Sequence, residues 1–106
     1  MAGPIVPFTV RFRRGQQGVV ATYTLEALAN KGIRETFRQG GNAADLVRNF
    51  PGAAAALTSA LACFTIMKLK EPELRADLLD EHGAAIMADA VEFGAMEAHI
   101  RAAWGV

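Results

Sequence analysis

The chain has 106 residues, the size of one domain, and 52% of them are hydrophobic, which excludes an intrinsically disordered tail. A single cysteine excludes a disulfide framework and a zinc site built from four cysteines or from two cysteines and two histidines. Eleven basic and eleven acidic side chains give a formal net charge of zero, which argues against a general nucleic-acid-binding protein.

The zero net charge hides a segregation of charge along the chain. Residues 1–50 carry seven basic and three acidic side chains, whereas residues 51–106 carry four basic and eight acidic ones. The first half therefore has a surplus of four positive charges, and the second half has an equal negative surplus. We expect either that the two halves fold onto each other or that the basic half of one copy meets the acidic half of another.

The first predicted element is a β-hairpin over residues 8–24. Apolar and polar side chains alternate from Phe8 to Arg13, as in a strand with one buried face. A turn is predicted at residues 15–18, and a second β-prone run follows over 19–24. Because a lone hairpin is only marginally stable in water, we expect it to pack on helices or to join a sheet shared between copies.

The remainder of the chain predicts helices, because apolar residues recur three and four positions apart between glycine and proline stops. The predicted helices run over residues 25–38, 43–50, 53–70, 72–81 and 84–104. The helix over 53–70 is apolar nearly all round and is expected at the centre of the core. The last helix carries two apolar stripes, and we expect one of them to face another chain.

These elements predict an α+β fold that is mainly helical. We expect one domain over residues 1–106, with an N-terminal β-hairpin over 5–24 packed on four to five helices within 25–106. The N-terminus lacks the basic and apolar regions of a signal peptide, so we expect a cytoplasmic protein. The uncharged run over 50–67 is rich in alanine and hydroxyl side chains, and we expect a buried helix there and no membrane span.

Few side chains suggest chemistry. His82 lies beside Asp80 and Glu81, but it has no second histidine at ligand spacing, so we expect a solvated helix end and no metal. Cys63 lies among apolar neighbours and is expected to be a packed thiol rather than a nucleophile. No cofactor motif and no nucleophile–base pair is present in the sequence, so we expect neither a cofactor nor enzymatic activity.

Two sets of residues are candidates for contacts with partners. One apolar stripe of the last predicted helix is the candidate surface for an apolar helix of a partner protein: Phe93, Met96, Ile100 and Trp104. Charged residues of the two halves are candidates for electrostatic contacts: Arg11, Arg13, Arg34, Arg38, Asp77, Asp80 and Glu81. No aromatic side chain lies on the arginine face of the hairpin, so stacking on nucleic-acid bases has no support.

The order of the elements along the chain carries a family resemblance. A strand pair is followed by TYTLEAL at 22–28, AADLVRNF at 43–50, an apolar helix, and KEPELRADLLDEHG at 70–83 before a last helix. This layout resembles the small tail assembly chaperones of long-tailed phages and of gene-transfer particles. The resemblance implies a non-catalytic, multi-copy protein that keeps a helical tape-measure protein soluble, self-associates and works in the host cytoplasm.

Two other functions stay open. The first is a small regulatory or inhibitory protein, encoded by a phage or by a host, that binds one protein target through the acidic residues near Asp77. The second is a nucleic-acid-binding protein that uses the arginines of the hairpin and of the segment 25–38.

Overall fold

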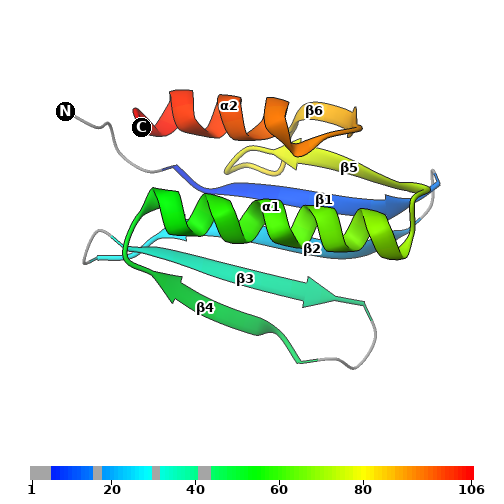
Figure 1. The fold of residues 1–106 in the computed structure, drawn as a ribbon, viewed down its shortest axis with the longest axis horizontal. Helices are drawn as coiled ribbons and strands as arrows, with labels where there is room; N and C mark the ends of the chain where they lie inside the picture. Colours follow the sequence, from blue (N-terminus) through cyan, green and yellow to red (C-terminus); the bar gives the residue numbers. More distant parts are fainter. Residues whose placement is uncertain (1–5, 16–17, 30–31, 41–43) are drawn as a thin grey trace.

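In the computed structural model the chain forms a six-stranded antiparallel sheet with two helices on one face (Figure 1). The structure describes residues 6–15, 18–29, 32–40 and 44–106. The strands are β1 (Phe8–Arg14), β2 (Val19–Ala27), β3 (Ile33–Gln39), β4 (Leu46–Phe50), β5 (Leu74–Leu79) and β6 (Ala85–Ala90). The helices are α1 (Ala53–Lys70) and α2 (Phe93–Trp104).

The strands lie in the order β4-β3-β2-β1-β5-β6. The first four form a meander, and α1 then carries the chain back across the sheet, so that β5 pairs with β1 (Figure 1). Every described strand pair is antiparallel. The basic half of the sequence therefore lies from β1 to the β4 edge, and the acidic half contributes β5 and the β6 edge.

The prediction of a mainly helical fold, with a helical part over residues 25–106, is wrong. The predicted helix 25–38 instead covers the end of β2 and most of β3, and residues 30–31 of it lie outside the described residues. The predicted helix 43–50 contains β4, with residue 43 outside the described residues, and 72–81 contains β5. The predicted helix 84–104 begins with β6, and only its last part is helical, as α2. In β3 and β5 the core-facing positions alternate, with a glutamate or an alanine between large apolar residues. That alternation is the pattern of a strand. However, Ile33 and Phe37 lie four positions apart, as do Leu74 and Leu78, and this spacing also fits a helix.

Two predicted elements are confirmed. β1 and β2 form the hairpin, with Val10 opposite Tyr23 and a register shift after Phe12. The helix predicted over residues 53–70 is α1, and it has the predicted bounds. It ends at Lys70 because Glu71 precedes Pro72, and a residue before proline disfavours the helical conformation. The middle of the predicted turn, residues 16–17, lies outside the described residues.

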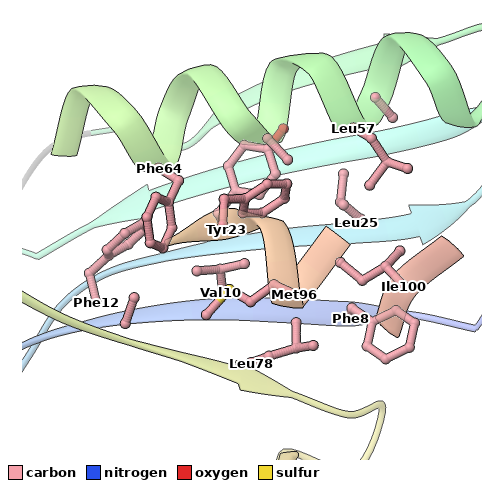
Figure 2. Close-up of a cluster of buried hydrophobic side chains, with 14 of the residues drawn as sticks. Phe8, Val10, Phe12, Tyr23, Leu25, Leu57, Phe64, Leu78, Met96 and Ile100 are labelled. Carbon is pink, nitrogen blue, oxygen red and sulfur yellow. The ribbon is translucent and has the colours of Figure 1, made fainter. Parts of the chain in front are cut away.

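The hydrophobic core lies between the sheet and the two helices (Figure 2). It consists mainly of Phe8, Val10, Phe12, Tyr23, Leu25, Leu57, Phe64, Leu78, Met96 and Ile100. The ring of Phe64 on α1 lies 6.0 Å from that of Phe12 on β1 and 5.6 Å from that of Phe93 on α2. Phe8, Val10 and Phe12 all point to one face of the sheet, because they alternate with side chains that point to the other face. Both helices pack on this face.

The helix α1 is buried on one side only, although it is apolar nearly all round. Leu57 faces the sheet and is 1% exposed, whereas Leu69, three turns further along, is 76% exposed. The single layer of strands beneath α1 can bury one stripe of the helix. Its other side is left to the solvent.

Leucine-to-alanine substitutions on the two sides of α1 should differ strongly. Leu57→Ala should lower the free energy of unfolding by about 2–5 kcal/mol, because it opens a cavity in the core. Leu69→Ala should change it by less than about 0.5 kcal/mol, because the side chain is exposed. Urea denaturation measures both values, and equal effects would contradict this orientation of α1.

Candidate protein-binding site

The apolar stripe predicted to bind a partner lies in the core. Phe93, Met96, Ile100 and Trp104 face the sheet from α2 and are buried. The indole Nε1 of Trp104 donates a hydrogen bond to the carbonyl oxygen of Val6 at 2.8 Å. In this fold the four side chains attach α2 to the sheet, so a surface for a partner has to come from other residues.

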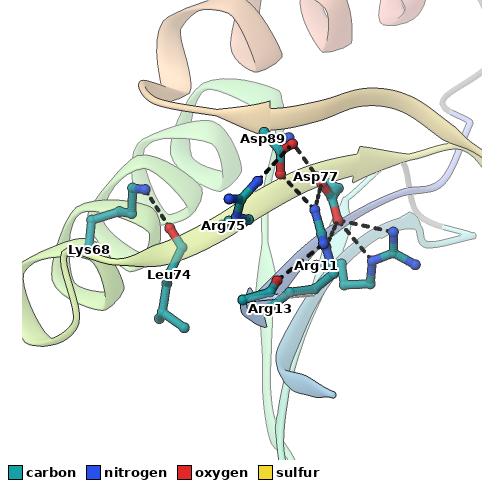
Figure 3. Close-up of polar contacts among 8 residues, drawn as sticks. Arg11, Arg13, Lys68, Leu74, Arg75, Asp77 and Asp89 are labelled. Carbon is teal, nitrogen blue, oxygen red and sulfur yellow. Dashed lines mark hydrogen bonds and ion pairs between the residues drawn. The ribbon is translucent and has the colours of Figure 1, made fainter. Parts of the chain in front are cut away.

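The predicted charged residues of β1 and β5 meet on the face opposite the helices (Figure 3). The carboxylate of Asp77 is fully buried and accepts hydrogen bonds from Arg11 Nε at 3.0 Å and from Arg13 Nη2 at 2.9 Å. Arg13 Nη2 also donates to Asp89 Oδ1 at 2.7 Å, and Arg75 Nη1 lies 3.2 Å from Asp89 Oδ2. The two oppositely charged halves of the sequence thus fold onto each other within one chain.

This network sets the ionisation of its central carboxyl. Burial by itself raises the pKa of Asp77. Hydrogen bonds from Arg13, from the Asp89 backbone N–H and from Arg11, together with the positive charge of Arg13, lower it. The second effect is larger, so the pKa of this carboxyl falls to about 2. Asp77 is therefore ionised at neutral pH. The arginines that hold it are engaged, which leaves them less available to a nucleic acid.

The other predicted charged residues do not join this cluster. Arg38 pairs with Asp45 at 2.9 Å, and Arg34 makes no ion pair among the described residues. Asp80 accepts hydrogen bonds from two backbone N–H groups of the β5–β6 turn, and Glu81 is exposed on the same turn. Because Asp77 is buried on the sheet, it does not form one acidic surface with Asp80 and Glu81.

The reactive residue types are dispersed. No group of three or more His, Cys, Asp or Glu side chains that could hold a metal ion is found among the described residues. Burial raises the pKa of the Cys63 thiol to about 12, so the thiolate needed for a nucleophile is not formed at neutral pH. The ring of His99 packs edge-on against the ring of Phe8, with 5.8 Å between the ring centroids. The other histidine, His82, lies on the β5–β6 turn.

Sequence reasoning missed the exposed side of α1. We define the α1 outer face as the side chains of this helix that point away from the sheet and are exposed: Ala54, Ala55, Thr58, Leu61, Ala62, Thr65, Ile66 and Leu69. None of them is charged, and the sequence has no charge between Ala53 and Met67. The signal was present in the sequence as a helix without a polar side, which we interpreted as a central core helix.

A pocket opens beside this face, between α1 and the outer strands β3 and β4. It has a volume of about 220 Å³. Its apolar walls include Phe37, Leu46, Ile66 and Met67, and Arg48 and Lys70 also line it. We call it the Glu35 pocket, because it contains the buried carboxylate of Glu35.

The Glu35 carboxylate is held by two hydroxyl groups. Tyr23 OH and Ser59 Oγ both donate hydrogen bonds to Glu35 Oε2. Burial and the hydrogen bond to Glu35 raise the pKa of the Tyr23 phenol, so this hydroxyl keeps its proton and acts as a donor. One oxygen of the carboxylate is thereby fixed from β2 and from α1.

A second hollow borders the α1 outer face on its other side. It has a volume of about 440 Å³ and lies between α1 and the segment that leads into α2. Leu61 and Leu69 of α1 and the exposed Val91 line it. The outer face is thus a raised apolar stripe with a hollow on each side, which is a shape that a second helix can fit.

Acid should destabilise the protein through Asp77. Because the folded state lowers the pKa of this carboxyl from 3.8 to about 2, its contribution of about 2 kcal/mol is present above pH 4 and is lost as the pH falls toward about 2. The wild type should therefore lose about 2 kcal/mol of its advantage in unfolding free energy over Asp77→Asn between about pH 5 and about pH 2. Urea titrations at several pH values measure it.

The matched control is Glu73→Gln, which removes an exposed carboxyl just before β5. Its unfolding free energy should follow the wild-type curve across the same pH range. An Asp77→Asn curve parallel to the wild type would contradict the role assigned to this carboxylate.

Comparisons with known proteins do not place the chain in a family. No family model matches the sequence, and neither the curated proteins nor the solved structures give a significant match. The resemblance to phage tail assembly chaperones stays a prediction.

Proposed function

We propose that this chain is a non-catalytic assembly factor of the chaperone type, which binds an apolar helix of a partner protein along the α1 outer face. The observation that carries the proposal is the exposed, uncharged side of α1. Leu61, Ile66 and Leu69 are large apolar side chains in contact with water on one helix. A contiguous apolar surface of this kind marks a place where another molecule binds.

The spacing of the outer face suits a helix as the occupant. Ala55, Thr58, Ala62, Thr65 and Leu69 follow one another at intervals of three and four residues. That repeat keeps one stripe facing a second helix over the length of α1. Alanine and threonine along the stripe allow the two helix axes to approach closely, and the larger side chains beside them fill the flanking hollows.

The charges at the end of α1 favour a partner over a second copy at this face. The last turn carries Lys68 and Lys70, and the first turn has no acidic residue. Lys68 Nζ donates a hydrogen bond to the carbonyl oxygen of Leu74 at 2.6 Å (Figure 3). Lys70, in contrast, is exposed. An antiparallel second α1 would bring its positive N-terminal end against Lys70, so a partner helix with acidic residues at this end fits better.

A lipid bilayer is the other apolar environment to consider for α1. The helix is long and apolar enough to cross a membrane by length and composition. However, Leu57 and Phe64 belong to the core, so a helix that left the sheet would expose the core residues beneath it. A protein partner, which can cover the outer face while α1 stays on the sheet, is the better match.

The two alternative functions have less support from the geometry. An inhibitor acting through an acidic face would need Asp77, which is buried under Arg11 and Arg13. A nucleic-acid-binding protein would need several unpaired arginines. Arg11, Arg13 and Arg38 are already paired with carboxylates of the same chain. Of the predicted arginines, Arg34 alone makes no ion pair among the described residues.

Binding of a helical peptide tests the proposal. The probe is a fluorescent amphipathic peptide as long as α1, with a leucine and alanine stripe and acidic residues near one end. The wild type should bind it, and Ile66→Lys and Leu69→Lys should each weaken binding at least about tenfold, because a charge is placed in an apolar contact. Fluorescence anisotropy measures the dissociation constants.

Val106→Lys is the matched control, because Val106 is an equally exposed apolar residue beyond α2. It should bind the peptide as the wild type does. Equal binding by all variants would contradict the proposal, and so would binding to lipid vesicles in place of the peptide.

We propose further that self-association uses the edge strand β4. This strand pairs with β3 without a register shift, and Leu46 and Val47 are exposed on it. The opposite edge, β6, pairs with β5 through two register shifts and holds Asp89 at a φ of 56°. Irregular edges of that kind resist the addition of a strand, so β4 is the better edge for pairing with a second copy.

Light scattering after size-exclusion chromatography tests this part. The wild type should have a molar mass above that of one chain, and Val47→Lys should lower the mass, because it places a charge on the pairing edge. Ile86→Lys, on the β6 edge, should leave the mass unchanged. A wild type that is monomeric at high concentration would contradict self-association.

A further inference from the structure

A buried acid occupies a core-facing position of β3. Glu35 is 6% exposed and lies on the same side of the strand as Ile33 and Phe37, where an apolar residue is the usual choice. Its Oε2 atom accepts both of its hydrogen bonds, from Tyr23 and Ser59. Burial of a carboxylate is costly unless a cation or several donors compensate it, so this position calls for an explanation beyond packing.

The second oxygen of this carboxylate has only one long ion-pair contact among the described residues. Glu35 Oε1 accepts no hydrogen bond from any described residue. The nearest cation is Arg48, opposite Glu35 on the edge strand, with its Nε atom 3.9 Å from Oε1. The Arg48 side chain is 69% exposed, so this contact is loose and leaves an acceptor atom available to a ligand.

The size and lining of the Glu35 pocket narrow the class of ligand. Its volume of about 220 Å³ lies below the range of about 300–1,000 Å³ that is usual for small-molecule sites. Its walls are largely apolar, with Leu46, Ile66 and Met67 around the carboxylate. One long aliphatic side chain with a charged tip fits both features.

We infer that the pocket binds a lysine side chain of the partner helix, with the ammonium group on Glu35 Oε1 and the methylene stem against Ile66 and Met67. This inference rests on the proposed function and names its point of specificity. The pocket and the α1 outer face share Ile66, so a helix on that face can place a side chain into the pocket. Arg48 and Lys70 also line the pocket and would pair with acidic residues next to that lysine.

The one carboxylate oxygen of Glu35 that accepts no hydrogen bond favours lysine over arginine as the ligand. A guanidinium group pairs best with both oxygens of a carboxylate at once. At Glu35 one oxygen already accepts two hydrogen bonds, so the bidentate arrangement is not open. An ammonium group is a compact donor that can use the single remaining atom.

Two peptides that differ in one side chain test this inference. Both have the amphipathic sequence described above, with either lysine or its uncharged analogue norleucine at the central position of the contact stripe. The wild type should bind the lysine peptide about tenfold more tightly than the norleucine peptide, because only lysine donates to the buried carboxylate. Fluorescence anisotropy gives both dissociation constants.

Glu35→Gln should abolish this preference. Glutamine keeps an acceptor for Tyr23 and Ser59 but removes the charge, so both peptides should bind as the norleucine peptide binds the wild type. Glu73→Gln, which removes an exposed carboxylate elsewhere, should keep the preference. The comparison of the two peptides on the wild type stands by itself if Glu35→Gln does not fold.

The outcomes separate this inference from the function on which it rests. Equal binding of both peptides by the wild type overturns the lysine site and leaves the outer face as a helix-binding surface. Binding of neither peptide overturns the proposed function as well. A lysine preference that appears only in Arg48→Ala would mean that the chain's own arginine occupies the site, which also overturns the inference.

Discussion

The pairing of β1 with β5 is the interaction on which the rest of this structure depends. β1 belongs to the basic half and β5 to the acidic half, and the two strands align Arg11 with Asp77. On one face of this pair the core residues pack under the helices, and on the other the arginines surround a buried carboxylate. The charge segregation of the sequence is therefore used inside one chain, to join its two halves.

The same pairing decides where α1 lies and what it leaves exposed. Since β4 and β5 stand on opposite sides of the β1–β3 meander, the helix between them has to cross the sheet. Six strands about 4.8 Å apart make a sheet about 24 Å wide, whereas two helices of about 10 Å cover about 20 Å. The uncovered strip falls at β4, which explains the exposed Leu46 and the pocket beside Glu35.

Sequence patterns predicted the parts of the fold that local chemistry determines. The alternation from Phe8 to Phe12 gave the first strand, and the long apolar run before Lys68 gave α1 with its bounds. Strands β3, β4, β5 and β6 were missed because strands are stabilised by pairing with other segments of the chain, while their local spacing also fits a helix. The meeting of Arg13 with Asp77 and Asp89 depends on that pairing, so no local pattern could indicate it.

The binding surface illustrates the same limit. A helix that is apolar all round predicts burial, but the sequence does not say which side is buried by its own sheet and which side needs another molecule. Glu35 stands between the polar residues Arg34 and Thr36, so no local pattern indicates its burial, which follows from β3 lying beneath α1.

The most direct test of this account is a map of the contact surface by nuclear magnetic resonance, in which unlabelled helical peptide is added to isotopically labelled protein. If the partner helix binds on the α1 outer face, chemical-shift changes should concentrate on Leu61, Ile66 and Leu69 and on the neighbouring residues of β4. Changes centred on the core-facing side of α2, around Met96 and Trp104, or on the polar face around Arg11 would contradict it.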